Sequence, residues 1–243
     1  MKVLRAFHAV YCLLLFALLF FLFLPLFLIP IYFSKKHNWT GVLNRAWANV
    51  FFKLTFFPIQ LDYRFKPHKK EQYIFCANHF SYLDIPTMGL NRVNAVFVGK
   101  NDMERIPFFG FMYRKLHITV DRQSLKSRYA TILKSLKAIE DGKSLMIFPE
   151  GGILTTRYPN MVRFKDGAFR TAIEKQIPIV PVTIPFNWII LPDGIWFPKL
   201  KTIRVVYHEP LETVGMTLKD VEHLKKATYT TIDNELKKQL NES

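Results

Sequence analysis

The sequence predicts an α/β fold, with a mixed central sheet flanked by helices and an N-terminal membrane-embedded helical segment. Two observations predict it. From residue 70 onward, short apolar runs alternate with amphipathic stretches, which is typical of strands that alternate with helices. Before them, no residue between Arg5 and Lys35 carries a formal charge. That run exceeds the roughly 20 apolar residues that a bilayer-spanning helix needs.

The N-terminal run, residues 1–36, is predicted as a membrane segment. Lys2 and Arg5 would suit a cleaved signal peptide, but the apolar run is too long and no small-residue cleavage site follows it. Pro25 and Pro30 lack a backbone N–H and are expected to break or kink the helix. A single span and a re-entrant hairpin in one leaflet therefore both remain open.

Residues 37–66 are predicted to form an interfacial amphipathic helix and a linker, ahead of the main domain at 67–243. Between Gly41 and Phe57 a helix would place Leu43, Trp47, Val50 and Leu54 on one face. That pattern suits a helix lying in the membrane interface. A helix that faces the core gives the same pattern and is the alternative.

The main domain contains six apolar runs that we predict to be strands, at 73–77, 95–99, 117–120, 144–148, 179–184 and 203–207. Between the third and fourth runs, Ser124 can cap a helix that ends at Asp141-Gly142. Thr217, with Asp220 three residues later, begins like a capping box. A closing helix is expected to follow it.

The composition points to an anionic membrane as a partner. The chain is half hydrophobic and has 34 Lys plus Arg against 19 Asp plus Glu, a net charge of +15. Nucleic acid is not expected, because the charge is scattered and no base-reading motif is present. Cys12 and Cys76 have no C-x-x-C spacing, and no H-E-x-x-H pattern occurs. We therefore expect neither a metal site nor a cofactor, which disfavours a metal-dependent hydrolase.

The first candidate catalytic group follows the first run directly. His79 and Asp84 stand five positions apart just past the predicted strand end, where catalytic groups are common. If Asp84 holds one ring nitrogen of His79, the other can act as a base toward an alcohol. A structural hydrogen-bonded pair is the alternative. Because no G-x-S-x-G motif occurs, direct attack by a substrate hydroxyl is the simpler chemistry.

A second candidate group is a possible anion site. Glu150 and Gly151 follow another strand end, and Gly151-Gly152 can expose backbone N–H groups to an anion. Lys100 and Arg122 also follow strand ends, where they could meet a phosphate. Each taken alone could equally be a turn or a solvated surface charge.

Together these motifs resemble the 1-acylglycerol-3-phosphate acyltransferase family over roughly residues 70 to 190. The resemblance lies in the order of short motifs: Asn78-His79-x4-Asp84, Gly99-Lys100, Pro107-Phe108-Phe109-Gly110, Thr119-Val120-Asp121-Arg122, Phe148-Pro149-Glu150-Gly151, Phe164-Lys165-Asp166-Gly167-Ala168-Phe169 and Ile179-Val180-Pro181-Val182. It implies that residues 67–243 form an acyltransferase domain facing the cytoplasm. The implied reaction converts lysophosphatidate to phosphatidate in phospholipid synthesis, with acyl-CoA or acyl carrier protein as donor.

The resemblance also implies site residues. His79 would be the general base and Asp84 its partner, while the substrate-binding set would be Asn78, Lys100, Arg122, Glu150, Gly151 and Lys165. Two alternatives stay open: an acyltransferase for another lysolipid, such as an amino-acid lipid or lysophosphatidylcholine, and a non-catalytic lipid-binding membrane protein.

One departure from the family concerns its usual P-E-G-T-R-S motif. Here Gly152-Ile153-Leu154 follow Glu150-Gly151, so the Arg of that motif is missing. We expect Lys165, and after it Arg163, to supply the missing cation. Glu150 would then act mainly as a structural acceptor that holds neighbouring N–H groups or one of these cations.

Overall fold

The computed structural model describes residues 2–33, 39–68, 71–100, 104–120 and 125–242. Their helices and strands follow in the order α1 (Lys2–Tyr32), α2 (Trp39–Leu54), β1 (Ile59–Tyr63), β2 (Ile74–Ala77), α3 (Asp84–Met88), β3 (Ala95–Lys100), α4 (Phe109–Leu116), β4 (Ile118–Val120), α5 (Leu125–Glu140), β5 (Ser144–Ile147), α6 (Gly167–Lys175), β6 (Ile179–Thr183), α7 (Asn187–Ile190), β7 (Ile203–Tyr207), η3 (Leu218–Asp220) and α8 (Val221–Asn241).

The strands form one mixed seven-stranded sheet in the order β1-β7-β6-β2-β5-β3-β4. Strands β6, β2, β5, β3 and β4 run parallel, whereas β7 is antiparallel to β6 and parallel to β1. The carboxyl ends of β2, β5, β3 and β6 therefore meet at one edge of the sheet. The predicted α/β class and all six predicted strands are confirmed.

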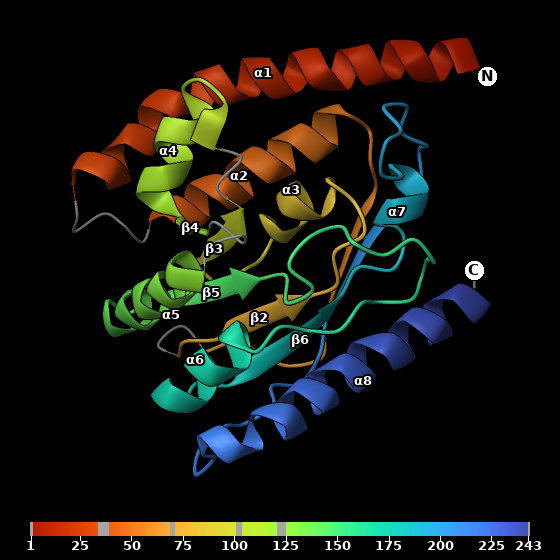
Figure 1. Cartoon of the computed structure of the whole chain (residues 1–243). Helices are drawn as coiled ribbons and strands as arrows, with labels where there is room; N and C mark the ends of the chain where they lie inside the picture. The colour runs from red at the N-terminus through yellow and green to blue at the C-terminus, as the bar shows by residue number, and fades with distance from the viewer. Residues whose placement is uncertain (1, 34–38, 69–70, 101–103, 121–124, 243) are drawn as a thin grey trace.

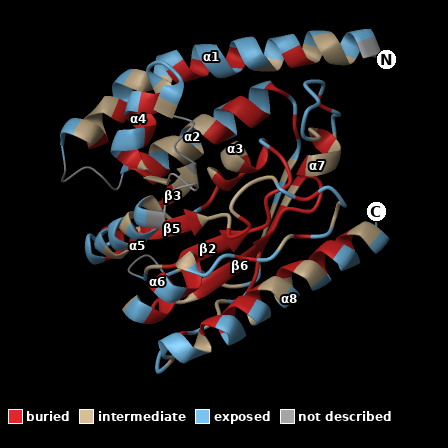
Figure 2. Ribbon diagram, viewed as in Figure 1, coloured by how far each residue is buried: buried red, intermediate tan, exposed pale blue. Residues whose placement is uncertain are grey.

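Helices cover both faces of the sheet (Figure 1). On one face α2 and α3 pack over the sheet and α1 packs on the outer side of α2, with Leu19, Phe52 and Met88 in the core. On the other face α5, α6 and α8 pack over it, with Ile139, Phe169 and Leu236 in a second core. The strands of the sheet are largely buried between these layers, as the red ribbons in Figure 2 show. This sandwich holds the strand ends, and the loops on them, in fixed positions.

Helix α1 is long and apolar enough to cross a membrane. Within Val3–Tyr32, the most apolar 18-residue window has a mean hydropathy of 3.1, and only 17% of that window is buried. The helix runs through Pro25 and Pro30 without interruption, so the expected break does not occur. In Figure 1 its C-terminal part turns down beside α4, where Phe20 and Phe109 lie in contact.

Helix α2 lies between α1 and the rest of the domain, and its two sides differ. Ala48, Phe51 and Phe52 are buried, as a core-facing helix requires. Trp47 stacks on Phe51 and meets α1. Val50, which the sequence pattern places on the same apolar face as Trp47, is 36% exposed. The helix therefore combines a core side with an exposed apolar edge.

The predicted linker after this helix contains a strand, β1, which corrects the sequence assignment. Ile59, Leu61 and Tyr63 alternate with Gln60 and Asp62, and all but the exposed Gln60 are partly buried. The strand pairs with β7 alone at the edge of the sheet. Because the strand is short and half-exposed, it has little apolar signal in the sequence.

The two predicted helices of the main domain are confirmed. Helix α5 ends at Glu140, directly before Asp141-Gly142; its expected cap, Ser124, lies outside the described residues. At the C-terminal end, the Thr217 N–H donates to Asp220 Oδ2 at 2.8 Å, which is half of the capping box. Helix α8 follows, with Val221, Leu224, Ile232 and Leu236 buried.

Candidate active site

The loop that follows β2 closes around the carboxylate of Asp84. Its Oδ2 atom accepts hydrogen bonds from the backbone N–H groups of Phe80 at 2.8 Å and Ser81 at 2.9 Å. Its Oδ1 atom accepts one from Asn187 Nδ2 at 2.9 Å. The side chain is fully buried, so these donors replace the water that a carboxylate would otherwise bind. The orientation of Asp84 is thus fixed before any ligand arrives.

The ring of His79 completes this arrangement. Its Nδ1 atom lies 3.0 Å from Asp84 Oδ2, and Phe148 at the end of β5 stacks on the ring with centroids 4.0 Å apart. Because Nδ1–H donates to the carboxylate, Nε2 carries the lone pair. Nε2 has no hydrogen-bond partner among the described residues, and the side chain is 10% exposed. The pair therefore presents one basic nitrogen at the edge of the site.

Glu150 ties this loop to the turn after β5. Its Oε1 atom accepts the His79 N–H at 2.7 Å, and its Oε2 atom accepts the Val162 N–H at 3.0 Å. The pKa of Glu150 is raised to about 7, chiefly by burial and to a smaller extent by the nearby charge of Asp84, while the two N–H donors oppose the rise. The structural-acceptor interpretation of Glu150 agrees with this geometry, since the carboxyl group holds backbone N–H groups.

Asn78 has both polar groups of its side chain engaged in the interior. Its Nδ2 atom donates to Ile184 O at 3.0 Å, and its Oδ1 atom accepts the Ile184 N–H at 2.8 Å. The residue is fully buried. This geometry joins the ends of β2 and β6 and leaves no amide group directed at a substrate, so it favours a positioning role over the substrate contact expected from sequence.

The turn at Gly151 brings Lys165 into the site. Gly151 has a φ of +85°, and a Cβ atom added there would lie 2.6 Å from Lys165 Nζ. The Lys165 N–H donates to Pro149 O at 2.9 Å, which fixes this segment against the turn. The lysine expected to replace the missing arginine thus lies over the paired glycines. A side chain at Gly151 would displace Lys165, and the positive φ there favours glycine.

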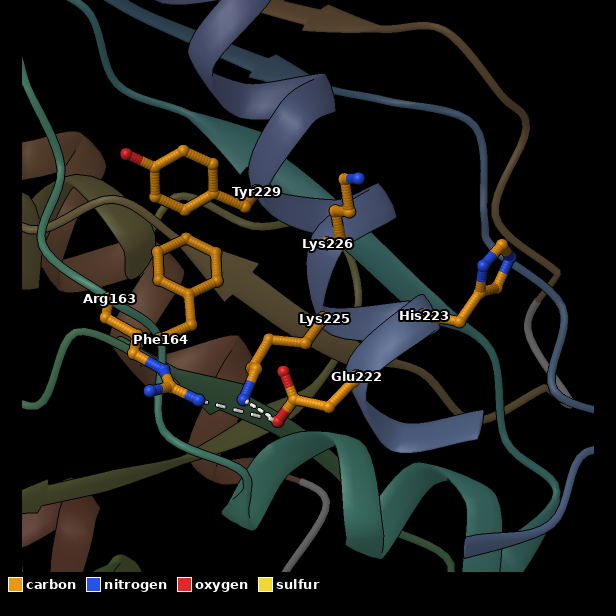
Figure 3. Close-up of a pocket in the computed structure, with 7 residues that line it drawn as sticks. All are labelled: Arg163, Phe164, Glu222, His223, Lys225, Lys226 and Tyr229. Atoms are coloured by element: carbon orange, nitrogen blue, oxygen red, sulfur yellow. Dashed lines mark hydrogen bonds and ion pairs between the residues drawn. The ribbon is translucent and has the colours of Figure 1, made fainter. Parts of the chain in front are cut away.

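Arg163 lies away from that turn. Its Nη2 atom is 3.8 Å from Glu222 Oε1 on α8. There it lines a surface hollow of about 570 Å³, and Lys225 also points at Glu222 (Figure 3). The other lining residues are Phe164, His223, Lys226 and Tyr229. The hollow contains neither His79 nor Asp84, so the geometry does not support Arg163 as the second-ranked replacement cation.

Of the two further predicted phosphate ligands, Lys100 and Arg122, the structure describes only the backbone of Lys100. Lys100 is the last residue of β3, in register with Val120 of β4, and it therefore lies at the edge of the sheet where Glu150 follows β5. The structure does not describe its side chain. Arg122 lies outside the described residues. Both assignments stay predictions.

The sequence analysis missed Asn187, which donates from Nδ2 both to Asp84 and to Thr87 Oγ1, the latter at 3.0 Å. It also missed Ser81, whose hydroxyl donates to Leu191 O at 2.7 Å. The one available signal is that Asn187 follows a predicted strand end, as His79 does. Since it is separated from Asp84 by 103 residues, no local spacing indicates the contact.

Comparisons with known proteins agree with this geometry. A family model described as Acyltransferase matches residues 60–185. An uncharacterized acyltransferase of Schizosaccharomyces pombe is 28% identical over 186 residues, which cover 72% of this chain and 66% of the relative. The 1-acyl-sn-glycerol-3-phosphate acyltransferase of Saccharomyces cerevisiae is 36% identical over 153 residues, which cover 61% of this chain and 50% of the relative.

A bacterial relative and a solved structure give the same picture. The 1-acyl-sn-glycerol-3-phosphate acyltransferase of Haemophilus influenzae is 30% identical, with 61% of this chain and 62% of the relative covered. The matched regions thus span from half to about two thirds of these curated relatives. The crystal structure of the LPA acyltransferase PlsC from Thermotoga maritima superposes with a TM-score of 0.77 at 20% identity, covering 97% of both chains. That similarity establishes a shared fold.

Proposed function

Because the chain belongs to the Acyltransferase family, we propose that it is a membrane-bound 1-acylglycerol-3-phosphate O-acyltransferase. It transfers a fatty-acyl group from a thioester donor to the free hydroxyl of lysophosphatidate and so forms phosphatidate for phospholipid synthesis. The observation that carries the proposal is the pair of His79 and Asp84, with Nδ1 and Oδ2 3.0 Å apart and Nε2 left for the acceptor. The names of two relatives in the comparisons support the choice of acceptor.

The reaction proceeds by direct attack. The acceptor hydroxyl gives its proton to His79 Nε2 while its oxygen attacks the thioester carbonyl carbon. Asp84 stabilises the imidazolium that forms, because its carboxylate accepts the Nδ1–H bond. The tetrahedral intermediate then collapses with cleavage of the carbon–sulfur bond. The thiolate leaves and takes up the proton from Nε2, which restores the neutral imidazole.

Binding of the acceptor phosphate falls to the turn after β5. Lys165 lies against the glycine turn at Gly151 there, and its ammonium group can bind a phosphate as a point charge. Lys100 and Arg122 are proposed as the further cations, and Glu150 and Asn78 as residues that hold this region in shape. The donor can be acyl-CoA or acyl carrier protein, since the basic chain complements the phosphate of either.

The membrane arrangement is part of the same proposal. Residues 1–36 attach the protein to an anionic membrane, α2 continues along it, and the acyltransferase domain, to which β1 contributes an edge strand, faces the cytoplasm. The density of Lys and Arg around residues 35 to 70 supports this orientation. The alternative of a lipid-binding protein without activity is disfavoured by a buried carboxylate that serves a histidine open on its other side.

The test is an assay of the purified full chain in mixed micelles. Lysophosphatidate is supplied with acyl-CoA or with acyl carrier protein, and the product mass is measured. Formation of phosphatidate that depends on His79 supports the proposal. Preferential acylation of lysophosphatidylcholine or of an amino-acid lysolipid would redirect it to another acceptor, and no product with any acceptor would favour the lipid-binding alternative.

A further inference from the structure

An exposed apolar loop lies between α7 and β7. Four of its large side chains face solvent: Ile195, Trp196, Phe197 and Leu200, with Trp196 72% exposed. Scattered exposed apolar residues are normal on soluble domains, but a cluster that includes a tryptophan marks an interaction surface. Tryptophan is also enriched where proteins meet the headgroup level of a bilayer.

The loop is fastened to the N-terminal part of α1. Arg5 donates from Nη2 to Phe197 O at 2.6 Å and from Nε to Pro198 O at 3.3 Å. Figure 1 shows the loop above α7, next to the N-terminal end of α1. Exposed Leu4 and Phe7 lie on that part of α1. The apolar loop thus continues the exposed face of the candidate membrane helix.

A second segment extends the same surface. Tyr11 OH donates to Leu54 O at 3.0 Å, and His8 Nε2 lies 3.0 Å from Thr55 O, so the end of α2 also rests against α1. Phe56, directly after it, is 71% exposed. Three parts of the chain that meet at the N-terminal half of α1 therefore each present exposed apolar side chains.

The charges at the loop fit an anionic bilayer. Lys199 is exposed, and Lys201 lies over the Phe186 ring with Nζ 4.3 Å from its centroid. Basic residues beside an apolar segment add electrostatic attraction to anionic lipid. A partner protein would need a matching apolar groove, whereas a bilayer supplies both the apolar interior and the anionic headgroups.

We propose that loop 195–200 is a second membrane anchor, which inserts Trp196 and Phe197 at the headgroup level of an anionic bilayer beside α1. The proposal rests on the membrane attachment in the proposed function but not on its chemistry. The segment directly before the loop holds the site, because Ser81 donates to Leu191 O and Asn187 of α7 donates to Asp84. Contact of the loop with lipid therefore positions the catalytic loop at the membrane surface.

The experiment measures the depth of the loop in the full chain. Cys12 is replaced by Ala, and Cys76 is buried and so protected from labelling. Trp196→Cys then carries an environment-sensitive fluorophore. The matched control is Val214→Cys, a residue 77% exposed in the turn between β7 and η3. Both proteins are reconstituted into vesicles of phosphatidylglycerol and phosphatidylcholine that contain nitroxide-bearing lipid.

The emission of the label at 196 should shift to the blue in vesicles. Nitroxide lipid should quench this label several-fold more strongly than the label at 214. A water-soluble quencher should instead quench the label at 214 more strongly. Equal quenching at both positions would overturn the proposal. If the label at 196 were shielded from the water-soluble quencher in detergent without lipid, and more strongly at higher protein concentration, the loop would belong to a protein interface instead. Neither the emission shift nor the quenching requires turnover, so a failure of the proposed reaction can be distinguished from a failure of the proposed membrane anchor. In an activity assay, Trp196→Ser should lose several-fold with acceptor in vesicles and little with micellar acceptor.

Discussion

Replacing Glu150 by Gln tests the connection between the histidine loop and the turn after β5. In the wild type the buried carboxyl group has its pKa raised to about 7 from the ordinary value of 4.5 by burial. When a carboxyl group has a higher pKa in the folded state than in the unfolded state, the free energy of unfolding falls as the pH rises between the two pKa values. The free energy of unfolding therefore has its full Glu150 contribution below pH 4.5 and loses it as the pH passes about 7.

The size of this change follows from the shift. At 1.36 kcal/mol per pKa unit, the change from 4.5 to about 7 corresponds to a loss of about 3 kcal/mol. The Glu150→Gln side chain would be neutral throughout and would not show this loss. Its amide has one acceptor for the N–H groups of His79 and Val162, so the variant gives up one bond, at about 1–3 kcal/mol. The variant should have a lower free energy of unfolding than the wild type at about pH 4.5 and a similar free energy of unfolding at about pH 8.

The assay is urea unfolding in detergent micelles, followed by tryptophan fluorescence from about pH 4.5 to about pH 8, where most of the wild-type carboxyl is ionised. Glu174→Gln is the control, because Glu174 is exposed on α6 and the change removes the same charge without a buried acceptor. The stability difference between wild type and Glu150→Gln should narrow by about 3 kcal/mol across this range. A difference that stays constant with pH, as expected for Glu174→Gln, would refute the reasoning.

Four further variants test the site. His79→Ala should lower turnover by about 10²- to 10⁴-fold while vesicle binding is unchanged; activity above a tenth of wild type would remove the general-base role. Asn187→Ala leaves Asp84 Oδ1 without its donor, so kcat should fall with little change in KM, and unfolding should cost about 1–3 kcal/mol less; an unchanged kcat would contradict the positioning role. Lys165→Ala should raise KM for lysophosphatidate but not for a neutral lysolipid. Arg163 pairs with Glu222, so Arg163→Ala should leave both KM values near wild type. If Lys165→Ala lost activity equally with both lipids, the phosphate site would lie elsewhere.

The parts of the fold that were predictable are those with a strong local pattern. Strand β6 (Ile179–Thr183) is buried at every residue and reads as a continuous apolar run, as a buried parallel strand does. Strand β1 has one exposed and four partly buried residues, so its alternation was too short to separate from a linker. For α2, the sequence could not tell the side that meets α1 from the side that meets the core, because both neighbours are apolar.

The site divides in a similar way. His79 and Asp84 are five positions apart, so one turn brings them together, and sequence spacing was enough to pair them. Lys165 was found through its motif and lies at the turn it was expected to serve. Asn187 reaches Asp84 only because β6 lies beside β2 in the sheet. A contact made by strand order has no trace in local sequence, which explains both its omission and the assignment of Asn78 to substrate.

The position of β1 determines the order in which the chain can assemble. Strand β1 pairs with β7, and Ile59 is in register with Ile203; these residues are separated by nearly the whole domain. At about 5–20 residues synthesised per second, the partner of β1 leaves the ribosome roughly 7 to 30 seconds after β1 itself. Helix α1 emerges before both and can enter a bilayer during that interval. A chain whose α1 inserts during that interval closes its sheet while attached to the membrane, so the long-range contact between β1 and β7 then forms at the lipid surface.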